Sequence, residues 1–308
     1  MLRFIAVALI TNSHFDGVYP INISFGGALG VATFFLISGF LLRINRQTRL
    51  LPWIRKRLLR IYPSVWVCSL FLLIVRHFQI TSVAEAFTMF VFPTRWWYVK
   101  NVILLYIPFY LVRKYLWAYK NYVLSVIVVM YLALYVFHGS WDTFFIDSFY
   151  FRLIYGFVAM ILGAIIREHE AETSKGVNSM YICFAGLSVV LFLGSKYIQG
   201  RFVYAGYFQV LSHVSAVLFA YFSCRALMGM EQYFRNRNNT MLYISIAAIS
   251  NSSLEVYFCQ HWVISMFKEM AFPLNFTLII ITISVLGYVL NRGIRYISSK
   301  AISGLRKI

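Results

Sequence analysis

Long apolar segments, separated by short polar ones, follow one another along the whole chain. Each is about as long as a helix that crosses a bilayer, for which ~20 apolar residues are needed. We therefore predict helices over residues 2–19, 25–43, 61–78, 96–112, 121–138, 148–166, 179–195, 203–223, 245–266 and 275–291. This pattern predicts an all-α polytopic membrane protein with about ten transmembrane helices in one bundle, forming a single domain over residues 1–308.

The polar connections between these helices differ in character. The connection over 44–60 is the most basic, and Pro52 is expected to break any continuous helix there. The connection over 79–95 contains an apolar portion, Ala84–Phe92, which we expect to dip into the membrane interface. No internal repeat and no matched pair of broken helices is visible in the sequence, which weighs against a transporter built from inverted repeats.

Composition supports the membrane prediction, and the charge distribution predicts the orientation. Hydrophobic residues make up 61% of the chain and charged residues 12%, while the net charge is +18. In a soluble protein such a charge would indicate nucleic acid as a partner. Here most of the 28 Lys and Arg residues fall on one side of the predicted spans if the N-terminus is cytoplasmic. This positive-inside bias places both termini in the cytoplasm and removes the need for a nucleic acid partner.

The cysteines and three of the six histidines indicate packing rather than chemistry. Four cysteines stand singly in apolar segments without CxxC spacing, so we expect neither a disulfide framework nor a metal site. His77, His138 and His213 are expected at interfaces or in helix packing.

Arg3 and His14 are the first candidates for function. They are eleven residues apart, close to three helical turns, so a helix over 2–19 would place both on one face, ~16 Å apart along its axis. Ionisable groups inside a membrane are costly and usually functional. His14 is either a general base or a histidine hydrogen-bonded within the bundle. Arg3 either snorkels to the headgroups or binds phosphate.

Small residues in the second predicted helix also allow two interpretations. Gly26 and Gly30 are four residues apart, a spacing typical of close helix packing. Ser38 and Gly39 either serve the same packing or leave room for a substrate arm beside His14.

Further candidates lie in the third and ninth predicted helices. Arg57 and Arg60 are three residues apart and would project from one side of a helix, where they could attract a polyphosphate, although positive-inside topology alone predicts a basic segment here. Glu255 and His261 are about 600° apart on a helix, so they cannot form a local pair. Asp16 is expected to face away from His14.

Taken in chain order, these residues resemble the membrane-bound acyltransferase-3 (O-acyltransferase) family. The resemblance rests on the Arg-x10-His spacing of Arg3 and His14, and on the run FFLISGFLL at 34–42. It continues through the basic segment that ends in 57–63, Trp96-Trp97-Tyr98, Arg152 with Gly156 and Gly163, and 253–257 leading to His261.

The resemblance implies an enzyme of the bacterial inner membrane that takes acetyl from cytoplasmic acetyl-CoA, its co-substrate. The acceptor would be a hydroxyl of an envelope glycan such as O-antigen, capsule or exopolysaccharide. His14 would be catalytic, and the donor would bind at Arg3, Arg57, Arg60, Ser38 and Gly39. The acceptor would bind at Arg152, Glu255 and His261. Membrane lipids are the other expected partners, and no metal is implied.

Two non-enzymatic interpretations stay open at this point. The first is a proton-coupled transporter or flippase of a lipid-linked sugar or small solute, in which His14 couples proton movement. The second is a membrane scaffold for envelope assembly. The sequence likewise leaves open the identity of the acceptor and acyl groups other than acetyl. It also leaves open the oligomeric state, a preceding N-terminal extension and a covalent acyl-histidine.

Overall fold

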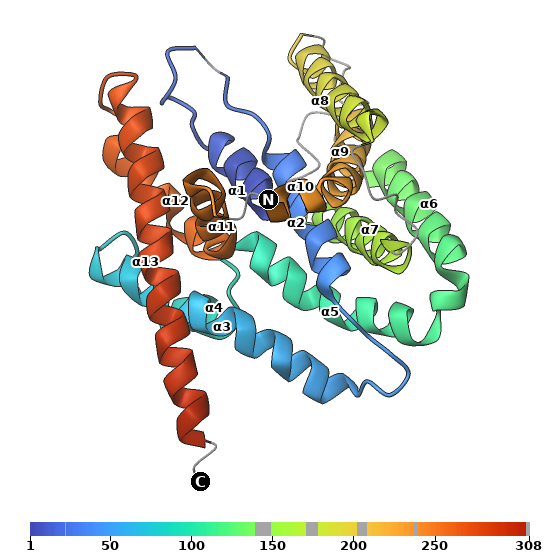
Figure 1. Ribbon diagram of the computed structural model, residues 1–308, viewed down its shortest axis with the longest axis horizontal. Helices are drawn as coiled ribbons and strands as arrows, with labels where there is room; N and C mark the ends of the chain where they lie inside the picture. The colour runs from blue at the N-terminus through green and yellow to red at the C-terminus, as the bar shows by residue number, and fades with distance from the viewer. Residues whose placement is uncertain (22, 139–148, 171–177, 202–207, 237–238, 306–308) are drawn as a thin grey trace.

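The structure is a computed structural model that describes residues 1–308 except 22, 139–148, 171–177, 202–207, 237–238 and 306–308. Within the described residues the regular elements are all helical, as predicted (Figure 1). In chain order they are α1 (Leu2–Asn12), α2 (Gly27–Leu41), α3 (Leu50–Ile74), α4 (Val83–Phe90), α5 (Trp97–Tyr115), the 3-10 helix η1 (Trp117–Tyr119), α6 (Lys120–His138), α7 (Phe149–Glu168), α8 (Ser179–Gln199), α9 (Gln209–Gly229), α10 (Glu231–Asn236), α11 (Met241–Asn251), α12 (Ser253–Phe267) and α13 (Leu274–Leu305).

Six helical segments in the described part of the chain are long and apolar enough to cross a membrane. They are α3, α6 together with η1, α7, α8, α9 and α13. Helices α1, α2 and α11 are apolar but shorter. The protein is therefore a multi-pass helical membrane protein, whereas the prediction of about ten spans with cytoplasmic termini is not confirmed.

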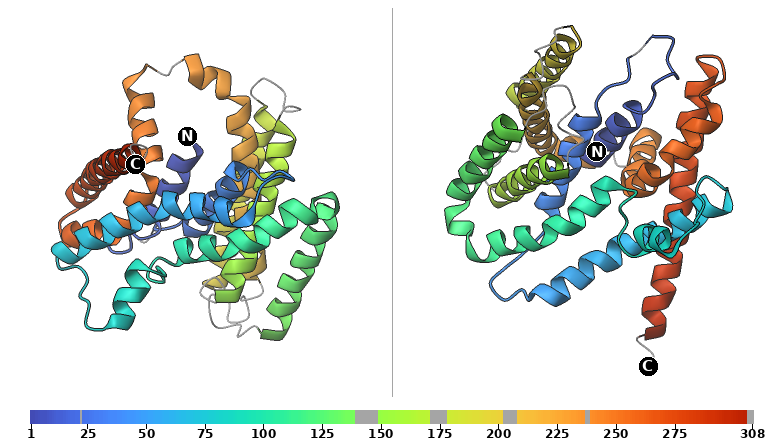
Figure 2. Two further views of the ribbon diagram at one scale, coloured as in Figure 1. Left: turned by 90° about the horizontal axis from the view of Figure 1, so that it is seen from below. Right: turned by 180° about the vertical axis from the view of Figure 1, so that it is seen from behind.

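The helices form two groups, with α1 and α2 between them (Figures 1 and 2). Helices α6 to α9 make one group, and α11 to α13 make the other. Helices α3 and α5 run across the lower part of the molecule in Figure 1. The closest packing joins α8 to α9, α2 to α7, α1 to α2 and α12 to α13. Helix α1 lies between the groups and contacts α11 and α12 of one group and α9 of the other.

Glycines allow α2 to lie unusually close to its neighbours. A Cβ on Gly30 would lie 2.5 Å from the Ala6 carbonyl oxygen of α1, so the predicted packing role of this glycine is confirmed. On the other face, a Cβ on Gly39 would lie 1.8 Å from the carbonyl oxygen of Met160 in α7. Such backbone approach is typical of small residues in membrane helix pairs. Helix α2 is thereby fixed on both sides.

The first helix is shorter than the predicted span over 2–19, because it ends at Asn12. The Ser13 hydroxyl donates to the Ile10 carbonyl (2.7 Å), and the Asn12 amide donates to the Phe25 carbonyl (2.9 Å). Side chains of this kind offer the backbone local alternatives to a helix. Gly17 then has a φ of 76°, in the left-handed region that favours glycine. His14 therefore lies in the turn that follows α1 and not on the helix.

The predicted basic loop over 44–60 is also wrong in its second half, because α3 begins at Leu50. Pro52 does not break this helix. It occupies the first turn, where a backbone N–H has no intrahelical acceptor and a proline is tolerated. Arg57 and Arg60 are consequently on a helix, three residues apart, as their proposed pairing requires.

Between α3 and α5 the predicted apolar portion of the connection is the short helix α4, which folds back along α3. The Trp66 indole N–H donates to the Phe90 carbonyl (2.9 Å), and the Tyr62 hydroxyl donates to the Val91 carbonyl. Carbonyls at the end of a helix lack intrahelical donors. These two aromatic side chains supply them and hold α4 against the middle of α3.

The predicted ninth span over 245–266 is two helices, α11 and α12, which meet at Ser252. The Ser252 hydroxyl donates to the Ala248 carbonyl (2.9 Å). At the same break, the Asn291 amide of α13 donates to the Asn251 carbonyl (3.1 Å). Only the Ser252 bond is local, and the bond from Asn291 comes from 40 residues further along the chain. The apolar residues on both sides conceal this break in the sequence. The break places the first turn of α12 beside α13.

A cationic cavity and a histidine pair at the two ends of α1

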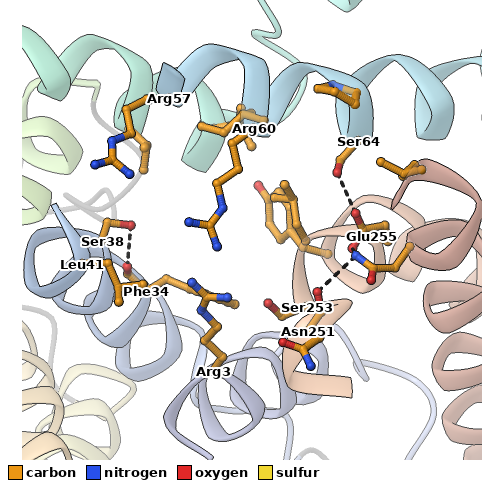
Figure 3. Close-up of a pocket in the computed structure, with 18 of the residues that line it drawn as sticks. Arg3, Phe34, Ser38, Leu41, Arg57, Arg60, Ser64, Asn251, Ser253 and Glu255 are labelled. Atoms are coloured by element: carbon orange, nitrogen blue, oxygen red, sulfur yellow. Dashed lines mark hydrogen bonds between the residues drawn. The ribbon is translucent and has the colours of Figure 1, made fainter. Parts of the chain in front are cut away.

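The largest group of predicted site residues lines one cavity of about 630 Å³. It opens between the N-terminal end of α1, the C-terminal end of α2, the middle of α3, and α5, α12 and α13. Five predicted residues line it (Figure 3): Arg3, Ser38, Arg57, Arg60 and Glu255. They come from four helices distant in sequence, so the fold and not the local sequence assembles them.

Positive charge is concentrated in this cavity. Arg3 extends from α1 and Arg60 from α3, and their guanidinium groups point toward one another (Figure 3). Arg57 and Arg295 also line the cavity. Like charges repel at close range, more strongly as water is excluded. A cavity that collects four guanidinium groups is thus arranged for a ligand with several negative charges.

Among the described residues that line the cavity, Glu255 is the one that carries a carboxylate. It is 2% exposed, and both of its oxygens accept hydrogen bonds. The Ser64 hydroxyl donates to Oε1 (2.6 Å), and the Asn291 amide donates to Oε2 (3.1 Å). Because the donors come from α3 and α13, the carboxylate ties three helices together at the wall of the cavity. Burial of such a group is tolerable because it is hydrogen-bonded.

Ser38 and Gly39 have different roles, although they are neighbours in α2. The Ser38 hydroxyl donates to the Phe34 carbonyl (2.9 Å) and lies 3.2 Å from the Tyr98 hydroxyl at the cavity wall. Gly39 instead faces Met160 of α7 at backbone contact. The structure does not place Gly39 in the cavity, so its contribution is helix packing and not donor binding.

His14 and His261 form a pair at the other end of α1. Their ring centroids are 4.2 Å apart with an interplanar angle of 58°. Beside them the Thr11 hydroxyl donates to the Gln260 side-chain carbonyl (3.1 Å), and both of these side chains are buried. This bond joins α1 to α12 and fixes the turn that carries His14 against the helix that carries His261.

The structure separates the histidine pair from the cationic cavity. Neither His14 nor His261 lines that cavity, and the interpretation of Arg3 and His14 as two positions on one helical face is wrong because α1 ends first. The cavity and the histidine pair lie at opposite ends of α1, which is ~16 Å long. Glu255 and His261 contribute to different places, as their spacing predicted, and Asp16 is exposed.

Arg152 belongs to neither group. Its guanidinium lies over the ring of Trp97, 4.5 Å from the ring centroid. This cation–π contact holds the Arg152 side chain in position.

Comparison with known protein families assigns the chain to a family. Residues 1–291 match the acyltransferase domain that defines the acyltransferase-3 family. The chain belongs to this family. Neither the curated proteins nor the solved structures contain a match. Family membership makes the protein a membrane acyltransferase, and the comparisons do not support the alternative of a transporter.

Sequence reasoning missed several residues of the cavity in this acyltransferase-3 protein. Ser64 and Asn291 hold the carboxylate of Glu255, and Arg295 adds a charge one helical turn beyond Asn291. The four-residue spacing of Asn291 and Arg295 puts both on one face of α13. That spacing was the available signal, but a basic residue near a helix end is ordinary in a membrane protein.

Proposed function

We propose that this protein is an O-acetyltransferase of the bacterial inner membrane. It transfers acetyl from cytoplasmic acetyl-CoA to a hydroxyl of an envelope glycan such as O-antigen, capsule or exopolysaccharide. The observation that carries the proposal is the convergence of Arg3, Arg57, Arg60 and Arg295 on one cavity in a member of an acyltransferase family. The identities of the acetyl donor and the glycan acceptor rest on the resemblance described above.

The cationic cavity is the proposed donor site. Coenzyme A carries several phosphate groups, and a guanidinium group binds phosphate with two parallel N–H donors. Arg57 and Arg60 line the cavity from α3, and Arg3 lies opposite them. Ser38 marks the wall at which the cavity meets α2 and Tyr98. The hydrogen-bonded Glu255 faces the same cavity, so we assign it to positioning the donor and not to acceptor binding.

His14 is the proposed general base. Its imidazole accepts the proton of the acceptor hydroxyl while the oxygen attacks the thioester carbonyl carbon. The carbon–sulfur bond then breaks, and the imidazolium returns the proton to the leaving thiolate. One ester and one thiol are thereby formed from one hydroxyl and one thioester. His261, in contact with His14, is proposed to contact the acceptor hydroxyl, and Arg152 remains a proposed acceptor residue on the resemblance alone.

The test is ester formation by purified protein from radiolabelled acetyl-CoA and candidate glycans. We expect alkali-labile label on a glycan with the wild type and its loss with His14→Gln, which keeps hydrogen bonding but cannot take a proton. General-base help is worth ~10²–10⁴-fold in rate. His169→Gln, near the end of α7, is the matched control and should retain activity. Ester formation by His14→Gln at the wild-type rate would remove His14 from catalysis.

A further inference from the structure

A second cavity, of about 290 Å³, lies at the N-terminal end of α2. Its walls come from the turn after α1, the first residues of α2, the last turns of α8 and the first turn of α9. Ser13 lines it and directly precedes His14 in the chain. The cavity is therefore next to the turn that carries the proposed base, at the opposite end of α1 from the donor cavity. Its size is near the lower end of ligand pockets, ~300–1,000 Å³.

One wall of this cavity is an ordered polar network inside the helix bundle. The Ser212 hydroxyl lies 2.6 Å from the Ser195 hydroxyl and accepts a hydrogen bond from the Gln199 amide (2.9 Å). His213, 7% exposed, also lines the cavity, with its Nδ1 paired to the Tyr131 hydroxyl. Burying polar side chains costs free energy unless they find partners. Here they are partnered by one another, and two of them, Ser212 and His213, line the cavity.

The cavity also favours negative charge. Lys196 lines it, and none of its lining residues, all within the described chain, carries a carboxylate. Gly26, at the N-cap position of α2, lines the cavity together with Gly27 and Ala28, so the N-terminal end of this helix borders it. The positive end of the helix dipole lies at the same place. Gly27 allows this turn to approach closely, since a Cβ there would lie 2.7 Å from the Ser13 hydroxyl.

Two aromatic side chains complete the walls, Phe25 from the loop before α2 and Phe192 from α8. A sugar ring has apolar C–H faces and hydroxyls at its edge. It is matched by a small cavity that combines aromatic rings with hydroxyl, amide and imidazole groups. A carboxylate on that sugar would meet Lys196 and the N-terminal end of α2.

We infer that this cavity binds an acidic sugar unit of the acceptor, a ring that carries a carboxylate, and presents the glycan to His14. The inference rests on the proposed function, because it names the class of acceptor for that reaction. It adds an acceptor site formed by α2, α8 and α9 at residues that the resemblance does not assign.

A binding test that does not involve acetyl-CoA examines the site. Ser24→Cys places a thiol in the cavity lining, and Cys183→Ser removes the exposed natural thiol. The rate at which a maleimide labels Cys at position 24 is measured in phosphatidylcholine vesicles with glucuronic acid or with glucose, its neutral counterpart. We expect glucuronic acid to slow labelling and glucose to have a weaker effect. Lys196→Met should weaken protection by the acid about tenfold or more, since a charge-assisted bond is lost, and Lys196→Arg should keep most of it.

The control and the alternatives are distinguishable. Lys268→Met removes an exposed lysine elsewhere and should leave the protection unchanged. Equal labelling with and without glucuronic acid, or full protection in Lys196→Met, would overturn the inference. Protection by phosphatidylglycerol vesicles without sugar would also overturn it, because the occupant would then be a lipid headgroup. Protection without any acetyl transfer would support the acidic-sugar site and contradict the proposed acetyl transfer. Acetyl transfer without protection would support the proposed transfer and contradict the acidic-sugar site.

Discussion

Removal of two arginines from the donor cavity gives the sharpest test of the proposed acetyl-CoA site. Arg57 and Arg60 line the cavity from one face of α3. The Arg57 guanidinium also lies 5.7 Å from the ring centroid of Trp53, a contact that orients it. In the double variant Arg57→Ala/Arg60→Ala the helix remains, while two of the four guanidinium groups leave the cavity.

The magnitude follows from how these side chains are placed. A well-made hydrogen bond to a charged group contributes ~1.5–3 kcal/mol. Arg60 is exposed and Arg57 half-buried, so solvent screens both and the lower figure applies. Two such contacts amount to ~3 kcal/mol, or about a hundredfold in binding at ~1.4 kcal/mol per tenfold. We expect the KM for acetyl-CoA to rise by about that factor, with a much smaller change in the KM for the acceptor.

The assay is initial-rate acetyl transfer with acetyl-CoA varied at fixed acceptor, in vesicles with matched protein levels. Arg55→Ala is the matched control, because it removes a charge from an exposed position on the same helix without lining the cavity. Arg57→Lys/Arg60→Lys should recover only part of the loss, since lysine keeps the charge but not the planar fork. An unchanged KM for acetyl-CoA in the alanine double variant would refute the donor site and leave positive-inside topology as a sufficient explanation of the arginines.

Three further predictions concern the fold around the site. Gly39→Ala should lower stability by ~1–3 kcal/mol, because its Cβ would lie 1.8 Å from a carbonyl oxygen of α7. Gly186→Ala, whose Cβ meets nothing within 4 Å, should be neutral or stabilising, and equal thermal unfolding temperatures of the two variants in detergent would contradict this. Thr11→Val should lower the free energy of unfolding by ~1–3 kcal/mol, because the buried side-chain carbonyl of Gln260 on α12 loses its hydrogen-bond donor. Thr33→Val loses only a hydrogen bond within α2 and should lower it by less in the same thermal unfolding experiment. Arg49→Cys should be labelled from the cytoplasmic side only, and labelling by an impermeant reagent outside intact cells would reverse the proposed topology.

Apolar patterning was sufficient to predict the helical class and most of the helices. Helices α5, α7 and α8 begin and end within a few residues of their predicted bounds, because their apolar runs are long and uninterrupted by local competitors. The spacing of Gly26 and Gly30 likewise predicted close packing, which the approach of α2 to α1 confirms. Both signals are local, so each can be read from one stretch of chain.

Failures occurred where a few side chains override the apolar pattern. The hydroxyl of Ser13 and the amide of Asn12 end α1 early, and Ser252 interrupts the predicted ninth span, although the apolar residues around them continue. Pro52 gave the opposite error: it was predicted to break a helix, but it lies in the first turn of α3, where a proline is tolerated. The partners of Glu255 could not be predicted from spacing, because they lie 191 and 36 residues away along the chain.

The separation of Arg3 from His14 constrains how the proposed reaction can run. The cationic cavity is at one end of α1 and the histidine pair at the other, ~16 Å apart along a helix of eleven residues. If the arginines hold the phosphates, the thioester must lie at the far end of an extended arm that runs beside α1 toward His14. A rigid α1 then sets the distance between phosphate and base. Because Gly30 at α2 and Gln260 at α12 hold this helix from both sides, changes at either contact should alter the rate of transfer before they alter donor binding.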